Sequence, residues 1–196
     1  MDARFAPSRT SSWIIVASCI AISAAAAITE VAMGRSWLGP DGRFALWEGN
    51  IWSSEQSQRF ADPYSLTHVG HGFLFYAVLW LAARRIPVRY RLVAAVVLEA
   101  AWEVLENSPI IIDRYRAVTI ALGYVGDSIL NSMSDILMMA IGFLLAWRLK
   151  LWASVAAVVA IELGLLFWVR DNLTLNIVML VHPIEAIKAW QSAGHP

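Results

Sequence analysis

Two stripes of polar side chains, each inside strongly apolar sequence, contain the residues best suited to proton transfer or ion binding. The first stripe has an acid at positions i, i+4 and i+7, and the second has polar residues at i, i+4 and i+8. Their members are Glu99, Glu103 and Glu106, followed by Asp127, Asn131 and Asp135. Residues at these spacings share one face of an α-helix. Because ionised groups are costly in hydrocarbon, we expect both faces to point into a functional protein interior.

The deepest acids of the two stripes, Glu99 and Asp135, are expected to lie at similar depth. A helix rises about 1.5 Å per residue, which places each of them about 12 Å below the outer end of its helix if the two helices run antiparallel. Two neighbouring carboxylates cannot both ionise cheaply. They must therefore share a proton, pair with an arginine or bind a cation.

Two histidines, His68 and His71, stand at i and i+3 near the start of another apolar segment and share a helix face. Imidazole and carboxylate ligands together suit zinc, manganese or iron. The sequence therefore predicts a divalent metal site formed by His68, His71, Glu106 and Asp135. Proton transfer by the histidines, or simple packing in a helix core, is the alternative.

The predicted reactive centre consists of Glu103, His71, Asp127 and Asn131. Glu103 lies about 6 Å below the outer end of its helix, a depth that a lipid head group could reach. His71 could relay a proton, and Asp127 begins the facing helix, where the helix dipole favours a carboxylate. Acids in different surroundings can act as a general acid and a general base.

The predicted substrate-binding residues are Arg114, Arg116, Asn107 and Arg170. The first two could hold a phosphate or carboxylate head group of an amphiphilic or lipid-linked substrate. No serine or cysteine has the sequence context of a nucleophile, so attack by water or direct transfer is expected. A divalent metal ion is the one candidate cofactor that these residues suggest.

Composition indicates a membrane protein. Of the 196 residues, 59% are hydrophobic and 15% are charged, whereas a soluble domain has about a quarter charged residues. The mean hydropathy is +0.59. A formal net charge of zero gives no sign of nucleic-acid binding, so the lipid bilayer is the expected partner. The single cysteine, Cys19, excludes an internal disulfide and a cysteine-based zinc site.

The expected fold is all-α, a polytopic transmembrane bundle that forms one domain over residues 1–196. About five spans are predicted, at residues 13–33, 66–83, 91–107, 128–147 and 151–169. The first resembles a signal peptide but is longer than a usual signal core, which favours an uncleaved helix. Residues 173–190 are apolar but interrupted by Asn176, His182 and Pro183, so we expect a short interfacial helix there.

The polar loop 34–65 contains three tryptophans, Trp37, Trp47 and Trp52. Tryptophan is common at the membrane surface, which favours a solvated loop with its aromatic residues at the interface. The alternative is that the loop covers the buried acids as a lid.

Basic residues predict the orientation. The turns 84–91 and 148–150 are rich in arginine and lysine, which places them and the N-terminus in the cytoplasm by the positive-inside rule. The unusual polar residues of all the spans then converge on the outer half of the bundle. The predicted result is an outward-opening polar cavity.

The chain resembles a family of short alphaproteobacterial membrane proteins, domain-of-unknown-function family 2585, also called uncharacterised protein family 0314. The resemblance rests on DPYSLTHVGHGFLFY at 62–76, WEVLENSPIIIDRYR at 102–116, YVGDSILNSMSD at 124–135 and RDNLTLNI at 170–177. It covers nearly the whole chain and implies a multi-pass protein of the bacterial inner membrane, without a known activity.

A looser similarity is to VanZ-like membrane proteins. Their order of a histidine-bearing helix, a glutamate-bearing helix, an arginine, and then Asp and Asn is matched here by His68, Glu103, Arg116, Asp127 and Asn131. The spacing agrees approximately, and the similarity concerns architecture.

Three classes of function are consistent with these residues. We favour an intramembrane acid–base enzyme that acts on a lipid or envelope amphiphile. The alternatives are a protein that binds or transports an ion or envelope ligand, and a structural protein whose polar residues only join helices. Acids at membrane depth outnumber bases, which argues against pairing as their sole role.

Overall fold

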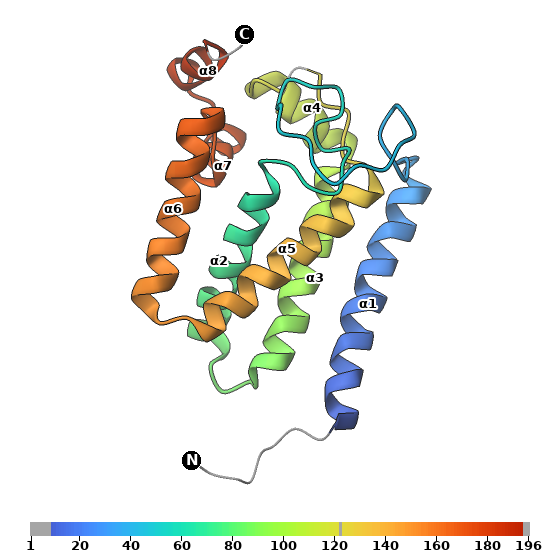
Figure 1. Cartoon of the computed structure of the whole chain (residues 1–196), viewed down its shortest axis with the longest axis vertical. Helices are drawn as coiled ribbons and strands as arrows, with labels where there is room; N and C mark the ends of the chain where they lie inside the picture. The colour runs from blue at the N-terminus through green and yellow to red at the C-terminus, as the bar shows by residue number, and fades with distance from the viewer. Residues whose placement is uncertain (1–8, 122, 194–196) are drawn as a thin grey trace.

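Eight helices make up the fold over residues 9–121 and 123–193, the part of the chain that the computed structural model describes. They are α1 (Arg9–Ala32), α2 (Ser65–Ala83), α3 (Val88–Glu106), α4 (Pro109–Val118), α5 (Ile129–Arg148), α6 (Leu151–Val169), α7 (Leu173–Val181) and α8 (Glu185–Ser192) (Figure 1). Between α1 and α2, Trp47 and Ala61 form an isolated parallel bridge. The all-α prediction is confirmed.

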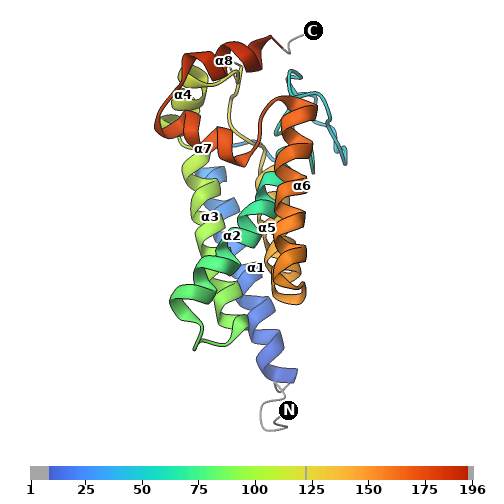
Figure 2. The same ribbon diagram turned by 90° about the vertical axis from the view of Figure 1, so that its left-hand side faces the viewer.

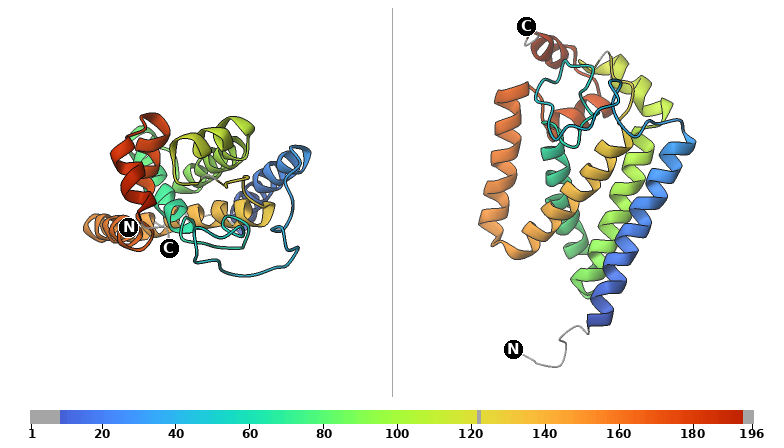
Figure 3. Two further views of the ribbon diagram at one scale, coloured as in Figure 1. Left: turned by 90° about the horizontal axis from the view of Figure 1, so that it is seen from above. Right: turned by 45° about the vertical axis from the view of Figure 1, so that its right-hand side comes forward.

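Four helices within the described residues, α1, α2, α5 and α6, are long and apolar enough to cross a membrane. Their bounds agree with the predicted spans to within a few residues. The remaining predicted span, 91–107, corresponds to α3, which has 19 residues but carries three glutamates. α3 lies beside α1 in the bundle (Figure 3). The length of α3 suits a span, and a fifth crossing stays a prediction.

The core forms between α1, α3 and α5, with partly buried residues of α2 packed against it. Ala95 and Val96 of α3 pack with Met139 and Phe143 of α5, and all four are buried. α2 and α5 cross at very short distance, because Gly72 faces the backbone of α5 and Gly142 faces that of α2. Small residues permit such close helix packing in membrane proteins. α6 stands on the other side of the bundle from α1 (Figures 1 and 3).

Loops and short helices gather at one end of the bundle, where α4, α7, α8 and the segment 33–64 lie (Figures 1 and 2). The segment between the predicted spans 91–107 and 128–147 is not all loop, because its first part is α4. Pro109 occupies the first turn of this helix, where its missing N–H costs nothing, and α3 ends before it at Glu106.

The prediction of one interfacial helix over 173–190 needs correction, because two short helices, α7 and α8, are present. His182 has an extended backbone (φ −140°, ψ 87°), and Pro183 follows it. A residue before proline is disfavoured in the helical region, which accounts for the break.

The basic turns lie at the end of the bundle opposite α4, α7 and α8 (Figure 1). We therefore expect reporter fusions at Ile86 and Lys150 to give a cytoplasmic signal, and a fusion at Asp41 to give a periplasmic signal. A fluorescent reporter and a periplasmic phosphatase reporter, fused at the same three positions, provide the measurement. Inverted signals at all three positions would contradict the orientation.

Candidate functional site

A cavity of about 410 Å³ lies at the loop-bearing end of the bundle, a size within the usual range of ligand pockets. Its walls come from α2, α3, α4, α5 and α7, and from the segments 51–64 and 119–127. The acids that line it are Asp62, Glu106, Asp127, Asp135 and Asp171. Among the described residues, neither lysine nor arginine lines it, so the cavity is rich in carboxylates without a fixed cation.

One side of the cavity is apolar and reaches the outside of the bundle. Leu74 of α2, Leu98 of α3 and Ile177 of α7 all line it, and they are 46%, 47% and 47% exposed. α7 lies across the upper ends of α2 and α3 (Figure 2). If α2 and α3 cross a membrane, this apolar, outward-facing wall would contact lipid.

The two histidines contact the same buried carboxylate. The Nδ1 atom of His68 lies 2.6 Å from Oε1 of Glu99, and Nδ1 of His71 lies 3.0 Å from that oxygen. Glu99 is fully buried, whereas both histidines line the cavity. Glu99 was absent from the predicted site residues although it belongs to the first stripe, so the spacing signal already included it.

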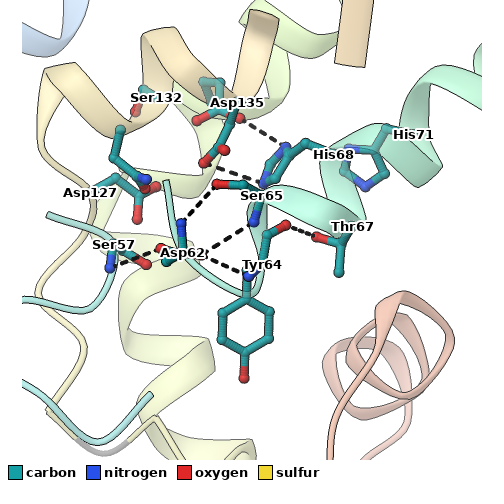
Figure 4. Close-up of polar contacts among 12 residues, drawn as sticks. Ser57, Asp62, Tyr64, Ser65, Thr67, His68, His71, Asp127, Ser132 and Asp135 are labelled. Atoms are coloured by element: carbon teal, nitrogen blue, oxygen red, sulfur yellow. Dashed lines mark hydrogen bonds and ion pairs between the residues drawn. The ribbon is translucent and has the colours of Figure 1, made fainter. Parts of the chain in front are cut away.

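Glu103, predicted as the central reactive acid, lies behind the cavity wall and is fully buried. Its Oε1 is 3.4 Å from Nδ1 of His68, and neither of its carboxylate oxygens has a hydrogen-bond partner among the described residues. On the other side of the same ring, Nε2 of His68 is 3.7 Å from Oδ2 of Asp135 (Figure 4).

The predicted metal ligands His68, His71, Glu106 and Asp135 all line the cavity. Two triads bring ligand atoms within 4.8 Å of one another, His68 with His71 and Glu99, and His68 with Glu103 and Glu106. Asp135 is in neither triad, and two acids that the predicted ligand set omitted, Glu99 and Glu103, take part.

Asp127 lines the cavity just before the first turn of α5. Its carboxylate accepts hydrogen bonds from the Tyr124 hydroxyl (2.9 Å) and from Nδ2 of Asn107 (3.2 Å). Burial raises its pKa to about 7, because the ionised form loses its hydration. Burial also raises the pKa of Tyr124, so its hydroxyl stays a donor. Asp127 can therefore exchange a proton near neutral pH.

Asn131, the remaining member of the predicted reactive centre, lies one helical turn from Asp127 and also lines the cavity. Its Nδ2 donates to the Arg59 carbonyl oxygen at 3.0 Å. The structure thus brings His71, Asp127 and Asn131 to one cavity and places Glu103 behind its wall.

Asp62 is a cavity acid that the sequence did not single out. Its carboxylate accepts from the backbone N–H groups of Ser57 (3.1 Å), Tyr64 (2.7 Å) and Ser65 (3.2 Å) (Figure 4). Burial raises its pKa. Since Asp62 lies three residues before the start of α2, it resembles a helix cap, and the DPYS sequence at 62–65 is the signal that could have revealed it.

The predicted substrate-binding arginines are used elsewhere in the fold. Arg114 donates to the Leu180 carbonyl oxygen through Nε (2.9 Å) and Nη2 (2.8 Å). Arg116 donates to the carbonyl oxygen of Tyr124. Neither arginine lines the cavity, and the contact of Arg114 connects α4 to α7.

Arg170 and Asn107, the other two predicted substrate-binding residues, also lie outside the cavity lining. Arg170 donates to the Trp190 carbonyl oxygen at 3.1 Å and lies over the indole ring. Asn107 is buried between the end of α3 and the start of α5.

The segment between α1 and α2 covers the cavity. Ile51, Trp52, Gln56 and Ser57 line it. Trp47 stacks on Trp168 of α6 at a centroid distance of 5.9 Å. The structure therefore favours the lid interpretation for Trp52, while Trp37 is 62% exposed, as expected of an interfacial residue.

Asp171 lies at the edge of the cavity between α6 and α7 and is 3% exposed. Its carboxylate accepts from the Tyr64 hydroxyl (3.1 Å), Nε2 of Gln191 (3.0 Å) and the backbone N–H of Asn172 (2.9 Å). Burial raises its pKa to about 6. An acid whose pKa is raised by folding stabilises the fold when protonated, and this contribution is lost as the pH rises from about 4 to about 6.

We expect Asp171→Asn to resemble the wild type in stability at pH 4 and to be more stable, by about 2 to 3 kcal/mol, at pH 7. Asparagine keeps the acceptor oxygen for Gln191 and Asn172, and its amide can donate to the Tyr64 oxygen. Thermal unfolding of both proteins in detergent between pH 4 and 7 measures the difference. A constant difference over this pH range would contradict the prediction.

Over its described residues, the protein is all-helical, with four apolar, membrane-length helices and a histidine–carboxylate cluster beside the cavity. The chain belongs to the family described as "Protein of unknown function (DUF2585)", which matches residues 30–193. The resemblance in the sequence motifs is thereby confirmed.

Relatives from alphaproteobacteria match over most of their length. A UPF0314 protein of Sphingopyxis alaskensis is 50% identical over 183 residues, covering 93% of this chain and 95% of the relative. A UPF0314 protein of Rhizobium meliloti is 48% identical over 184 residues, covering 94% and 92%. One from Paracoccus denitrificans is 51% identical over 171 residues, covering 85% and 89%. No solved structure matches the chain.

Proposed function

We propose that this protein is a multi-pass membrane enzyme that performs acid–base chemistry on the polar head group of an amphiphile, with Asp127 as the proton-exchanging residue. The observation that carries the proposal is the cavity itself. It combines an acid-rich interior with an apolar wall of exposed residues on α2, α3 and α7.

The two kinds of wall suit the two parts of an amphiphile. A polar head group can hydrogen-bond to the carboxylates, amides and tyrosines inside, while an apolar chain can leave past Leu74, Leu98 and Ile177. A water-soluble ligand would gain nothing from an opening into hydrocarbon. The substrate would enter laterally from the leaflet at the loop-bearing end, which the positive-inside rule makes the outer leaflet of the bacterial inner membrane.

Asp127 has the properties of a general acid or base. Its pKa of about 7 means that both protonation states are populated near neutral pH, where proton transfer is most efficient. In its ionised form it can accept the proton of an attacking water or hydroxyl group, and once protonated it can return that proton to the leaving group. Tyr124 and Asn107 hold the carboxylate in place.

A binding or transport role, or a purely structural one, would need no proton exchange at Asp127. The experiment therefore compares Asp127→Asn with Asp113→Asn, a matched control on the exposed surface of α4, where the Asp113 side chain is 75% exposed. Each protein is reconstituted in nanodiscs that contain a total lipid extract of an alphaproteobacterium. Mass spectrometry follows all lipid classes over time.

We expect the wild type and Asp113→Asn to convert one lipid class into a product with an altered head group. Asp127→Asn should slow this conversion by about 100-fold or more, the usual contribution of a general acid or base. Equal rates in Asp127→Asn and the wild type would remove Asp127 from the mechanism. No conversion by the wild type, with a lipid that co-purifies with it stoichiometrically, would favour binding or transport.

A further inference from the structure

The cluster of His68, His71 and Glu99 has the arrangement of a metal centre. Two imidazole nitrogens, both Nδ1, converge on one carboxylate oxygen at 2.6 and 3.0 Å. In a tetrahedral zinc site with bonds of about 2.0–2.2 Å, neighbouring ligand atoms are about 3.3 Å apart. To admit an ion, the shorter of these distances would have to lengthen by about 0.7 Å and the longer by about 0.3 Å, through movements of the side chains.

Glu103 provides a second and independent observation. It is 0% exposed, and both of its carboxylate oxygens lack a hydrogen-bond partner within the part of the chain that the structure describes. Its Oε1 faces the same Nδ1 of His68 at 3.4 Å. An ionised carboxylate without partners in a protein interior is costly, and either an added proton or a bound cation removes that cost.

The charges around the cluster favour a metal ion over paired histidines. Glu99 and Glu103 lie behind the cavity wall, and five further acids line the cavity. No lysine or arginine among the described lining residues offsets them. Two protonated histidines could balance Glu99 and Glu103, but the 3.4 Å contact from His68 reaches only Oε1 of Glu103 and leaves Oε2 without a partner among the described residues.

Asp135 occupies the position of an outer-sphere carboxylate. Its Oδ2 lies 3.7 Å from Nε2 of His68, the ring nitrogen that points away from Glu99 (Figure 4). Histidine ligands commonly place their second ring nitrogen against a carboxylate, which fixes the ring and strengthens the ligand. Asp135 would therefore orient the His68 ring without binding the metal ion itself.

We infer that His68, His71 and Glu99 bind one divalent transition-metal ion of the zinc class, through two imidazole nitrogens and one carboxylate, with Glu103 as a neighbouring acid beside His68. The site offers imidazole nitrogens and carboxylate oxygens and contains no thiolate. These ligands suit zinc, and also manganese or iron. The ion would neutralise the buried acids and join α2 to α3. Metal binding stands apart from the proposed catalytic role of Asp127, because its ligands are a different set of residues.

The test uses the full-length protein in detergent, freed of metal with a chelator and titrated with zinc chloride. The variants are Glu99→Gln and His71→Ala, and the matched control is His182→Ala, since His182 is exposed beyond α7. Metal content after removal of free zinc is measured by mass spectrometry. Manganese and ferrous salts are titrated in parallel. None of these measurements requires turnover.

We expect one zinc ion per chain in the wild type and in His182→Ala, and affinity weaker by about 100-fold or more in the two site variants. If a site variant does not fold, zinc should still raise the melting temperature of the wild type, because a ligand of the native state stabilises it. Absence of stoichiometric zinc, manganese or iron in the wild type, or undiminished binding in both site variants, would overturn the inference. A metal-loaded protein without lipid turnover would count against the enzyme proposal alone.

Discussion

Gly142→Ala is expected to leave little folded protein, although it adds a single methyl group. A Cβ at this position would lie 2.9 Å from the Val69 carbonyl carbon and closer still to its oxygen. The obstacle is the backbone of α2, which cannot move aside as a flexible side chain could. Gly72→Ala meets the same problem from the other helix, where the new carbon would be 2.7 Å from the Gly142 carbonyl carbon.

Adding atoms to a well-packed protein core usually lowers the free energy of unfolding by about 1–3 kcal/mol. A clash between two backbones should cost at least the upper end of that range. The matched control is Gly164→Ala on α6, where an added Cβ meets nothing within 4 Å. Yield and melting temperature of all three variants in detergent measure the effect. Wild-type stability in Gly142→Ala would mean that α2 and α5 do not cross as closely as described.

Asn107→Leu, a change that keeps the branching of the side chain but removes its polar atoms, is expected to destabilise the protein by about 3 kcal/mol or more, since it leaves several buried polar groups without partners. Oδ1 of Asn107 accepts from the Asp127 N–H at 2.7 Å. Its Nδ2 donates to Oδ2 of Asp127 (3.2 Å), Oγ of Ser132 (3.1 Å) and the Glu103 carbonyl oxygen (3.1 Å). One amide thus connects the end of α3 to the start of α5.

The control for this variant is Asn50→Leu, because Asn50 is exposed and its Oδ1 accepts one hydrogen bond, from the Trp52 N–H. Thermal unfolding in detergent should show a large loss for Asn107→Leu and a small one for Asn50→Leu. Similar melting temperatures for the two variants would show that the Asn107 contacts add little to stability. That result would favour the substrate-binding role that the sequence predicts for Asn107.

The long apolar helices were predictable because their signal is local. The predicted segment 66–83 became α2 at Ser65–Ala83, and 151–169 became α6 at Leu151–Val169. A run of apolar residues bounded by arginine, lysine or proline determines such a helix almost without reference to the rest of the chain. The concentration of polar residues at one end of the bundle also followed from sequence positions and helix length.

The short helices could not be predicted in the same way. α4 and α7 contain 10 and 9 residues, and helices of this length are marginal without tertiary contacts. Their stability depends on each other, through Arg114 and the Leu180 carbonyl and through the Tyr115 hydroxyl, which donates to Asn176 at 3.0 Å. The same contacts hold Arg114 away from the cavity, although its charge had suggested that it binds the head group of a substrate there.

The sequence by itself determined which helix faces carry the candidate groups, because residues at helical spacing must share a face. It identified His68 and His71 as one pair and the three glutamates of α3 as one stripe.

Which glutamate meets the histidines was decided only by the tertiary structure. Successive members of the stripe differ by about 6 Å in height for a spacing of four residues, so the axial position of α2 against α3 selects Glu99 as the shared contact. α2 is held against α5 by the close crossing at Gly72 and Gly142, a contact between segments about 70 residues apart that no local pattern specifies.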